Sequence, residues 1–293
     1  MKRVLLTGAG PRGFVGRNIA PFLAERYTLF TPDSSELDLR DLDSLKKYIS
    51  IKRIDTIVHS AVHNTITRGA ENALQFDLQM YFNIECVSGM VDKVLYFGSG
   101  AEFDKRLPID MVVEEDFGRS IPTDYYGFCK YIANKNTVQS KNIYNLRIFG
   151  VFGKYEYWPL KFISNLCCKA VFGMPLSVRK NCMFDFLFVE DLGPIVSWYI
   201  DHTPKYKDYN ICTGMPIDLI TIANIVSEVS EKSLLINVLA EGWNLPYTAD
   251  NTRMRNEISD LHITGMKKAV GKLYKYYNDN KETVDYNILA ESK

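Results

Sequence analysis

The chain has no excess of charge of either sign and no long apolar run. Its 35 lysines and arginines balance 35 aspartates and glutamates, so no overall field attracts nucleic acid or an anionic membrane. No apolar stretch is long enough to span a bilayer, and the start of the chain does not look like a signal peptide. We therefore expect a cytoplasmic protein with no nucleic-acid partner and no membrane partner.

Cysteine is present, but without the spacings that metal sites and disulfide frameworks use. The six cysteines form no Cys-x-x-Cys pair and no Cys/His pattern, so the sequence predicts no metal site. In a reducing cytoplasm we also expect free thiols. At 293 residues the chain can bury a full core, as one large domain or as a large and a small one.

The first residues place a strand, a glycine-rich turn and a helix in direct succession. Residues 3–7 predict a buried strand, and residues 18–25 predict an amphipathic helix. Glycines between them let the backbone turn tightly and approach a pyrophosphate, which then rests on the positive end of the helix. This order indicates a dinucleotide-binding unit, and a turn that merely packs is the alternative. The cofactor-binding residues predicted here are Gly8, Gly10, Arg12, Gly13, Phe14, Val15 and Gly16.

Strands and helices alternate through the first half of the chain. Such alternation predicts an α/β fold of the Rossmann type, a doubly wound parallel sheet covered on both faces. The remaining strands expected here are 27–30, 56–59, 94–97 and 142–149, and the helices are 44–50, 71–88 and 125–139.

From residue 151 onward the pattern is irregular. Here we expect helices at 162–171, 190–199 and 217–229, the last capped by Asp218, and a strand at 184–189. The sequence therefore predicts a dinucleotide-binding domain at 1–150 and a smaller, mostly substrate-binding lobe at 151–293. Segments at about 182–212 are expected to return to the main domain.

Tyr126 and Lys130 are four residues apart, so on a helix their side chains share one face. A nearby ammonium favours the phenolate and lowers the pKa of tyrosine toward working pH. By itself this spacing is more often a solvated helix face. After the glycine-rich unit, near the carboxyl end of a predicted strand, it predicts an acid/base pair in a ligand-binding crevice.

These segments together resemble the extended short-chain dehydrogenase/reductase family of nucleotide-sugar epimerases, dehydratases and reductases. The chain is most similar to the branch of GDP-L-fucose synthase and related 4-keto-sugar reductases. The resemblance spans nearly the whole length, through residues 7–16, 38–41, 58–61, 98–100, 126 with 130, 146–149, 185–192 and 209–211.

The resemblance implies a role for each matching residue. Tyr126 would exchange a proton with a sugar oxygen, Lys130 would lower its pKa and bind the nicotinamide ribose, and Ser99 would donate a second hydrogen bond to that oxygen. Asp38 and Leu39 would line the adenine, and Ala61 would also contact the cofactor. The resemblance further places Glu102, Arg179 and Arg253 at the substrate, each with a surface or structural role as the alternative.

The cofactor preference rests on Arg12, which matches an arginine that reaches the extra phosphate of NADP(H) in that branch. A guanidinium suits phosphate because it offers a bidentate fork. NADP(H) is therefore favoured. NAD(H) stays possible, because Asp33 follows the second strand and is placed to bind ribose hydroxyls.

The chain also departs from the fucose-synthase pattern. Ala101 stands where that branch has a cysteine, and no histidine lies between His63 and His202. Without this second acid/base pair, double epimerisation is not supported. Asp77 also stands where members of the family usually have an asparagine.

We therefore expect an NADP(H)-dependent reductase of a 4-keto-6-deoxy nucleotide sugar that serves surface-polysaccharide biosynthesis. The alternatives are an NAD-dependent nucleotide-sugar 4-epimerase and a non-catalytic dinucleotide-binding regulator. Family members often dimerise through two helices per subunit, which predicts a homodimer through residues 71–88 and 125–139.

Overall fold

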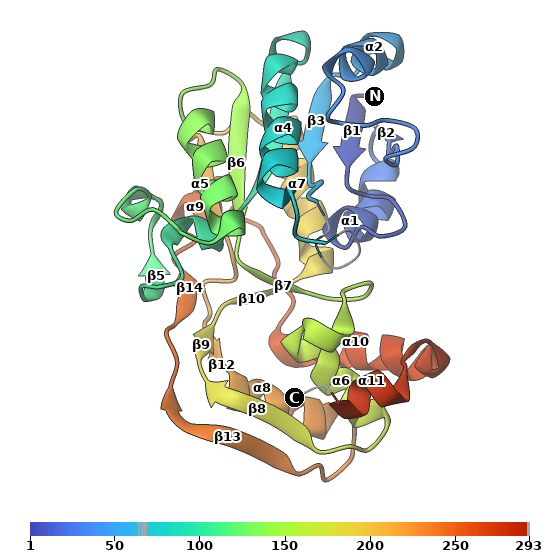
Figure 1. Ribbon diagram of the computed structural model, residues 1–293, viewed down its shortest axis with the longest axis vertical. Coiled ribbons are helices and arrows are strands. Elements are labelled where there is room, and N and C mark those ends of the chain that lie inside the picture. Colours follow the sequence, from blue (N-terminus) through green and yellow to red (C-terminus); the bar gives the residue numbers. More distant parts are fainter. Residues whose placement is uncertain (64, 66–68, 292–293) are drawn as a thin grey trace.

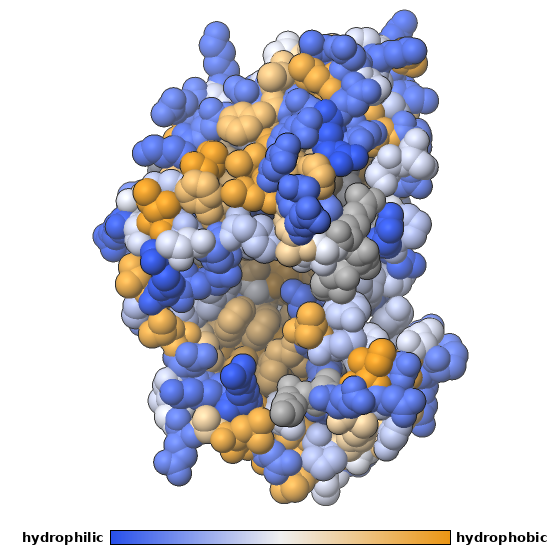
Figure 2. All heavy atoms as spheres, in the orientation of Figure 1, coloured by the Kyte–Doolittle hydropathy of each residue, from blue (hydrophilic) through white to orange (hydrophobic). Residues whose placement is uncertain are grey.

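The structure is a computed structural model that describes residues 1–63, 65 and 69–291. A larger part is built around a parallel sheet, and a smaller part lies beyond one end of that sheet (Figure 1). The arrowheads of β1 and β3 point toward the smaller part, and Figure 2 shows a hollow between the two parts. The carboxyl ends of the strands therefore face the region between the parts, where parallel sheets bind ligands.

The large sheet contains six strands, and every neighbouring pair is parallel. In spatial order they are β11 (Asp208–Ile211), β6 (Ile143–Ile148), β4 (Lys93–Ser99), β3 (Thr56–His59), β1 (Arg3–Thr7) and β2 (Thr28–Phe30).

Helices cover both faces of this sheet. Side chains alternate along β1, where Val4 and Leu6 enter one hydrophobic core and Leu5 enters the other. The first core is completed by α1 (Val15–Ala24) and α7 (Leu192–Asp201), and the second by α2 (Leu42–Lys52), α4 (Ala73–Cys86) and α5 (Tyr125–Thr137). This arrangement confirms the predicted doubly wound α/β fold.

The smaller part has a hydrophobic core of its own. Its elements are α6 (Phe162–Val171), α8 (Leu219–Val229), α10 (Met266–Asp279), α11 (Tyr286–Glu291) and the paired strands β8 (Leu176–Asn181) and β13 (Ile236–Trp243).

Short strands connect the two parts, and later segments of the chain return to the larger one. A four-stranded sheet has the order β12 (Ile217–Asp218), β9 (Met183–Phe184), β14 (Tyr247–Ala249) and β5 (Ile109–Val112), and β7 (Gly150–Phe152) pairs with β10 (Phe186–Phe188). Both α7 and β11 lie in the larger part, and Met254 of α9 (Thr252–Glu257) packs into its first core. The predicted domain boundary at residue 150 stays a prediction.

Several predicted elements differ from the structure at their ends. The strand expected at 184–189 is two strands, β9 and β10, which are separated at Asp185. The two strands have different partners, since β9 pairs with β12 and β14 whereas β10 pairs with β7. The carboxylate of Asp185 accepts hydrogen bonds from the backbone amides of Thr213 and Gly214. Asp218 does cap α8, because its side chain accepts from the amides of Ile220 and Thr221. The helix expected at 190–199 begins at Leu192, after a turn of 3-10 helix.

Among the described residues, no helix is both long and apolar enough to cross a membrane. All six cysteines are free thiols, and five of them are buried.

Candidate active site

The glycine-rich turn after β1 is folded so tightly that side chains would not fit. Gly8 has a φ of +74°, and a Cβ there would lie 2.8 Å from the backbone nitrogen of Ala61. A Cβ on Gly13 or Gly16 would lie 2.0 Å or 2.6 Å from the carbonyl oxygen of Gly8. Only glycine leaves the backbone room for this turn, and we call residues 8–16, which lead into α1, the cradle.

The N-terminus of α1 is open toward the cradle. Phe14, the residue before the helix, gives its first turn no side-chain cap among the described residues. The unpaired amides and the positive helix end suit a pyrophosphate, so this region fits a dinucleotide. Phe14 and Val15 pack on the first core and fix the start of the helix.

Two residues at the far end of the cradle bear on cofactor choice. A Cβ on Gly10 would lie 3.4 Å from Cβ of Asp33, so Asp33 flanks the turn. Hydrogen bonds from Ser35, and more weakly the charge of Arg12, lower the pKa of Asp33. Arg12 is exposed beside it. The structure thus places Arg12, which favours NADP(H), next to Asp33, which leaves NAD(H) possible.

The turn after β4 presents Ser99. Its hydroxyl accepts from the amide of Ala101, 3.2 Å away, and its own amide donates to Glu102 at 3.0 Å. These reciprocal bonds form a capping box for the following 3-10 turn, Gly100–Phe103. The capping box holds Ser99 at the carboxyl end of a central strand.

The helix α5 brings Tyr126 to that turn. Asp124 caps the helix by accepting from the amide of Gly127. A Cβ on Gly127 would lie 2.8 Å from the carbonyl oxygen of Ala101, so glycine lets the helix approach closely. Tyr126 consequently lies near Ser99, which acts to lower the pKa of this phenol. The structure therefore brings together the predicted serine and tyrosine.

Lys130 is buried one turn further along the same face. Its Nζ donates to the carbonyl oxygen of Phe97 at 2.7 Å and lies 5.7 Å from the centre of the Tyr126 ring. A second ring, that of Tyr96, lies 4.5 Å from the ammonium. The spacing of four therefore does place both side chains on one face, as predicted.

The expected lowering of the Tyr126 pKa by Lys130 stays a prediction, because burial dominates the pKa of this phenol. Burial raises the pKa of Tyr126 to about 12, and the neighbouring Ser99 only partly offsets this rise. Burial also lowers the pKa of Lys130. Tyr126 is consequently a protonated phenol at neutral pH, which suits a proton donor.

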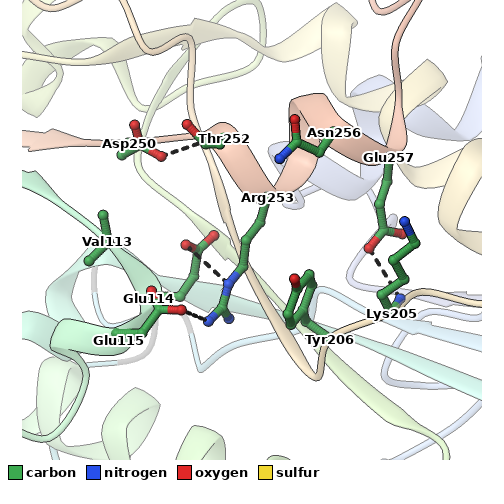
Figure 3. A pocket seen from close by; sticks show the side chains of 10 residues that line it. All are labelled: Val113, Glu114, Glu115, Lys205, Tyr206, Asp250, Thr252, Arg253, Asn256 and Glu257. Atoms are coloured by element: carbon green, nitrogen blue, oxygen red, sulfur yellow. Dashed lines mark hydrogen bonds and ion pairs between the residues drawn. The ribbon is translucent and has the colours of Figure 1, made fainter.

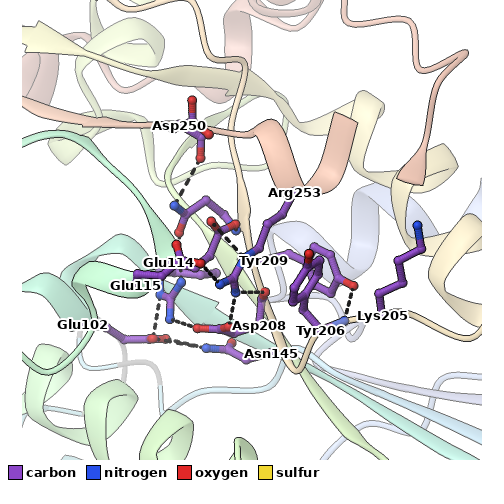
Figure 4. Close-up of polar contacts among 12 residues, drawn as sticks. Glu102, Glu114, Glu115, Asn145, Lys205, Tyr206, Asp208, Tyr209, Asp250 and Arg253 are labelled. Atoms are coloured by element: carbon purple, nitrogen blue, oxygen red, sulfur yellow. Dashed lines mark hydrogen bonds and ion pairs between the residues drawn. The ribbon is translucent and has the colours of Figure 1, made fainter. Parts of the chain in front are cut away.

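Glu102 has no exposed surface, which corrects its assignment as a substrate-binding residue. Its carboxylate pairs with Nε of Arg147 at 2.8 Å and accepts from the side-chain amide of Asn145. Arg147 is equally buried and pairs with Asp208 at 2.7 Å. Glu102, Asn145 and Asp208 lie close together in Figure 4. A Cβ on Gly98 would lie 2.3 Å from Oε1 of Glu102. Glu102 therefore supports the Ser99 turn from behind and does not face a ligand.

Arg253 is likewise withdrawn from the substrate site. Its guanidinium pairs with Glu114, Glu115 and Asp208, the last at 2.9 Å. Because Asp208 is the first residue of β11, Arg253 lies at the amino end of that strand, whereas Ser99 is at a carboxyl end. It lines a pocket of about 470 Å³ with several carboxylates, which would repel a diphosphate (Figure 3).

The other predicted residues lie in separate places. Arg179 occupies an exposed position of β8 in the smaller part. Asp38 pairs with Arg40 at 2.7 Å, and Leu39 packs into the second core. The amide of Ala61 donates to the Thr7 hydroxyl beside the cradle. Their contacts with a cofactor or substrate stay predictions.

Sequence reasoning missed Tyr247. Its hydroxyl oxygen would lie 2.5 Å from a Cβ on Gly100, the residue after Ser99, and burial raises the pKa of Tyr247. Tyr247 belongs to β14, far along the chain from Ser99. Only the pairing of β14 with β5 and β9 brings it to the site, and no local pattern signals that pairing.

Comparison with known proteins identifies the family of this chain. The profile of the NAD dependent epimerase/dehydratase family matches residues 4–212. GDP-L-colitose synthase from Yersinia pseudotuberculosis is 22% identical over 255 residues, which cover 78% of this chain and 82% of that protein.

Two solved structures have a similar fold. A GDP-L-fucose synthetase from Naegleria fowleri bound to NADP superposes with a TM-score of 0.82 at 16% identity, over 97% of this chain and 96% of that one. A UDP-glucose 4-epimerase from Thermotoga maritima with UDP-glucose gives 0.79 at 14% identity, over 95% and 99%. The chain therefore belongs to the NAD dependent epimerase/dehydratase family.

Proposed function

We propose that this protein reduces the keto group of a 4-keto-6-deoxy nucleotide sugar with NADP(H), in the cytoplasm, to make a sugar for a surface polysaccharide. The observation that carries the proposal is the placement of Tyr126 and Lys130 on one face of α5, beside the turn that carries Ser99 at the end of β4. Burial raises the pKa of Tyr126, so the phenol holds its proton at neutral pH. Reduction of a carbonyl needs such a donor, whereas oxidation of a hydroxyl needs the phenolate.

The residues of this site divide the work of a ketone reduction. When bound, a reduced nicotinamide supplies the hydride that forms the new carbon–hydrogen bond. Electrons of the broken carbonyl π bond move to the sugar oxygen, and Tyr126 gives that oxygen its proton. Ser99 donates a second hydrogen bond to the developing charge, and solvent returns a proton to Tyr126. One ketone, one reduced cofactor and one proton thus yield one alcohol and one oxidised cofactor.

The choice of NADP(H) rests on Arg12. Its exposed guanidinium lies beside Asp33, whose carboxylate is already engaged by Ser35. An arginine that is free to reach outward suits the extra phosphate of NADP(H). The fucose synthetase of similar fold also binds NADP.

A nucleotide-sugar 4-epimerase is the second candidate, because an enzyme of that activity has a similar fold. It would use the same Ser99, Tyr126 and Lys130 with tightly held NAD. The two candidates differ in stoichiometry, since an epimerase consumes no net cofactor. Retention of both Tyr126 and Lys130 argues against a non-catalytic regulator.

The test is to incubate the purified protein with NADPH and a panel of 4-keto nucleotide sugars that carry GDP, CDP, UDP or dTDP. Loss of NADPH absorbance with at least one substrate, and a product heavier by two hydrogens, supports the reductase. Copurified NAD together with isomerisation in the absence of added NADPH supports the epimerase instead.

We also propose a homodimer through α4 and α5, which pack against each other. Phe82 of α4 is 39% exposed and lines a shallow hollow with Ile132, Lys135 and Asn136 of α5 and with Gln139, which follows that helix. A second copy would cover the exposed ring of Phe82. Phe82→Asp should shift the protein to a monomer in light scattering. An unchanged mass, or a wild-type protein that is already monomeric, would refute it.

A further inference from the structure

The cradle contains a tight turn that carries Arg12. The backbone amide of Gly13 donates to the carbonyl oxygen of Gly10 at 2.8 Å, which closes a turn with Pro11 and Arg12 at its two corners. Both corner residues are exposed. Proline suits the first corner because its ring already fixes φ. The direction in which the Arg12 side chain leaves the backbone therefore depends on how firmly this turn is held.

Arg17, in the first turn of α1, contacts this turn. Its Nη1 donates to the carbonyl oxygen of Pro11 at 3.3 Å. Its guanidinium also lies over the ring of Tyr155, with 3.6 Å between Cζ and the ring centre. Arg17 is exposed, and a long exposed side chain has many rotamers available to it. The ring of Tyr155 thus restricts Arg17 to a position beside Pro11.

Tyr155 belongs to the segment that leads from β7 into the smaller part. Its φ is +69°, a left-handed conformation that tyrosine rarely adopts. Such a conformation persists only where neighbouring contacts impose it. Here Nδ2 of Asn18 in α1 donates to the carbonyl oxygen of Lys154 at 2.8 Å. The ring of Tyr276 in α10 lies 5.8 Å from that of Tyr155 and nearly perpendicular to it. The segment therefore links α1 to the smaller part.

We propose that Tyr155 is a positioning residue of the dinucleotide site, which acts through Arg17 on the turn that carries Arg12. This inference rests on the proposed NADP(H) site and deepens it. A dinucleotide that meets a turn already in place loses little conformational entropy on binding, whereas a loose turn must be ordered by the ligand. The smaller part, through Tyr155, thereby contributes to the affinity for the cofactor.

Calorimetry with NADPH on Arg17→Ala, Tyr155→Gly and the double variant tests the inference. Glycine suits a φ of +69°, so Tyr155→Gly removes the ring without straining the backbone. We expect Tyr155→Gly to weaken NADPH binding about two- to fivefold, the worth of an exposed cation–π contact. In the Arg17→Ala background it should change nothing further, because the ring acts through the guanidinium. Additive losses, or an unchanged affinity in either single variant, would overturn the proposal.

Two variants serve as controls. Tyr155→Phe keeps the ring, so it should bind NADPH as the wild-type protein does. Arg26→Ala removes another exposed arginine, whose guanidinium lies 3.7 Å from the ring centre of Phe22. It should leave NADPH affinity unchanged, because Arg26 follows the end of α1 that is away from the cradle. A loss in Tyr155→Phe as large as that in Tyr155→Gly would refute the role of the ring.

A measurement without cofactor or substrate follows the turn itself. Exchange of the Gly13 amide proton, measured by NMR, reports how often its hydrogen bond to Gly10 opens. The exchange should be faster in Arg17→Ala and Tyr155→Gly and unchanged in Arg26→Ala. If the wild-type protein binds NADPH but reduces no 4-keto sugar, only the reductase proposal fails. If the Gly13 amide exchanges equally fast in the wild-type protein and all three variants, Arg17 does not hold the turn, whatever the activity.

Discussion

The carboxylate of Glu102 and the guanidinium of Arg147 lie 2.8 Å apart, with no exposed surface on either side chain. The pair supports the turn that carries Ser99, because the other oxygen of the same carboxylate accepts from the Ser99 amide. Removing one partner of a buried ion pair leaves an uncompensated charge. Arg147→Met should therefore lower the free energy of unfolding by about 3–5 kcal/mol, measured by urea denaturation.

A surface pair supplies the comparison. Lys267 and Glu228 form an ion pair in which both side chains are more than half exposed. Lys267→Met should change the free energy of unfolding by about 1 kcal/mol or less. Equal losses of unfolding free energy at the two sites would show that burial does not strengthen the contribution of the Glu102–Arg147 pair to stability.

The cradle before α1 gives a second prediction. Gly13→Ala places a methyl group 2.0 Å from the carbonyl oxygen of Gly8, so the turn must open. We expect a loss of about 1–3 kcal/mol in stability and weaker dinucleotide binding by calorimetry. Gly89→Ala, where a Cβ meets nothing within 4 Å, is the matched control. If Gly13→Ala leaves NADPH affinity unchanged, the cofactor does not bind at the cradle.

Cofactor choice can be tested at Arg12. Arg12→Ala should weaken NADPH by about tenfold, the worth of one charge-assisted hydrogen bond, and leave NADH nearly unchanged. Arg119→Ala, a 76% exposed arginine away from the cradle, should alter neither. Equal weakening of both cofactors by Arg12→Ala would mean that Arg12 does not read the extra phosphate.

A buried acid in the smaller part predicts a pH dependence of stability. Glu156 is 7% exposed and accepts from the Ser164 hydroxyl at 2.7 Å. Burial raises the pKa of Glu156 to about 7. A raised carboxyl pKa stabilises the fold at low pH, and this contribution is lost as the pH rises from the unfolded value through about 7.

Glu156→Gln should remove that dependence, which amounts to roughly 3 kcal/mol between about pH 4 and pH 8. The free energy of unfolding at both pH values measures it, with the exposed Glu241→Gln as the control. An unchanged pH profile in Glu156→Gln would contradict the assignment.

The local features of this protein could be predicted from its sequence, and the long-range ones could not. The cradle and the cap at Asp218 follow from neighbouring residues, since glycine conformation and helix capping act over a few positions. The shared face of Tyr126 and Lys130 follows from helix geometry alone.

The failures have a common physical cause. The resemblance placed Glu102 at the substrate, and no local pattern reveals its true partner. Arg147 lies on the neighbouring strand, and only the register of β4 and β6 brings it close. The pKa of Tyr126 depends on burial by distant segments, which a spacing of four residues does not report. Tyr247 likewise reaches the site only because β14 pairs with the distant strands β5 and β9, which no local pattern reports.

Transfer of label from the cofactor tests the central claim most directly. The protein would be mixed with a 4-keto nucleotide sugar and NADPH that carries deuterium at the transferable position. We predict one deuterium on C4 of the sugar for each NADPH consumed, and almost none with Tyr126→Phe, which should still bind NADPH. Isomerised sugar without deuterium and without NADPH loss, or full label transfer by Tyr126→Phe, would contradict it.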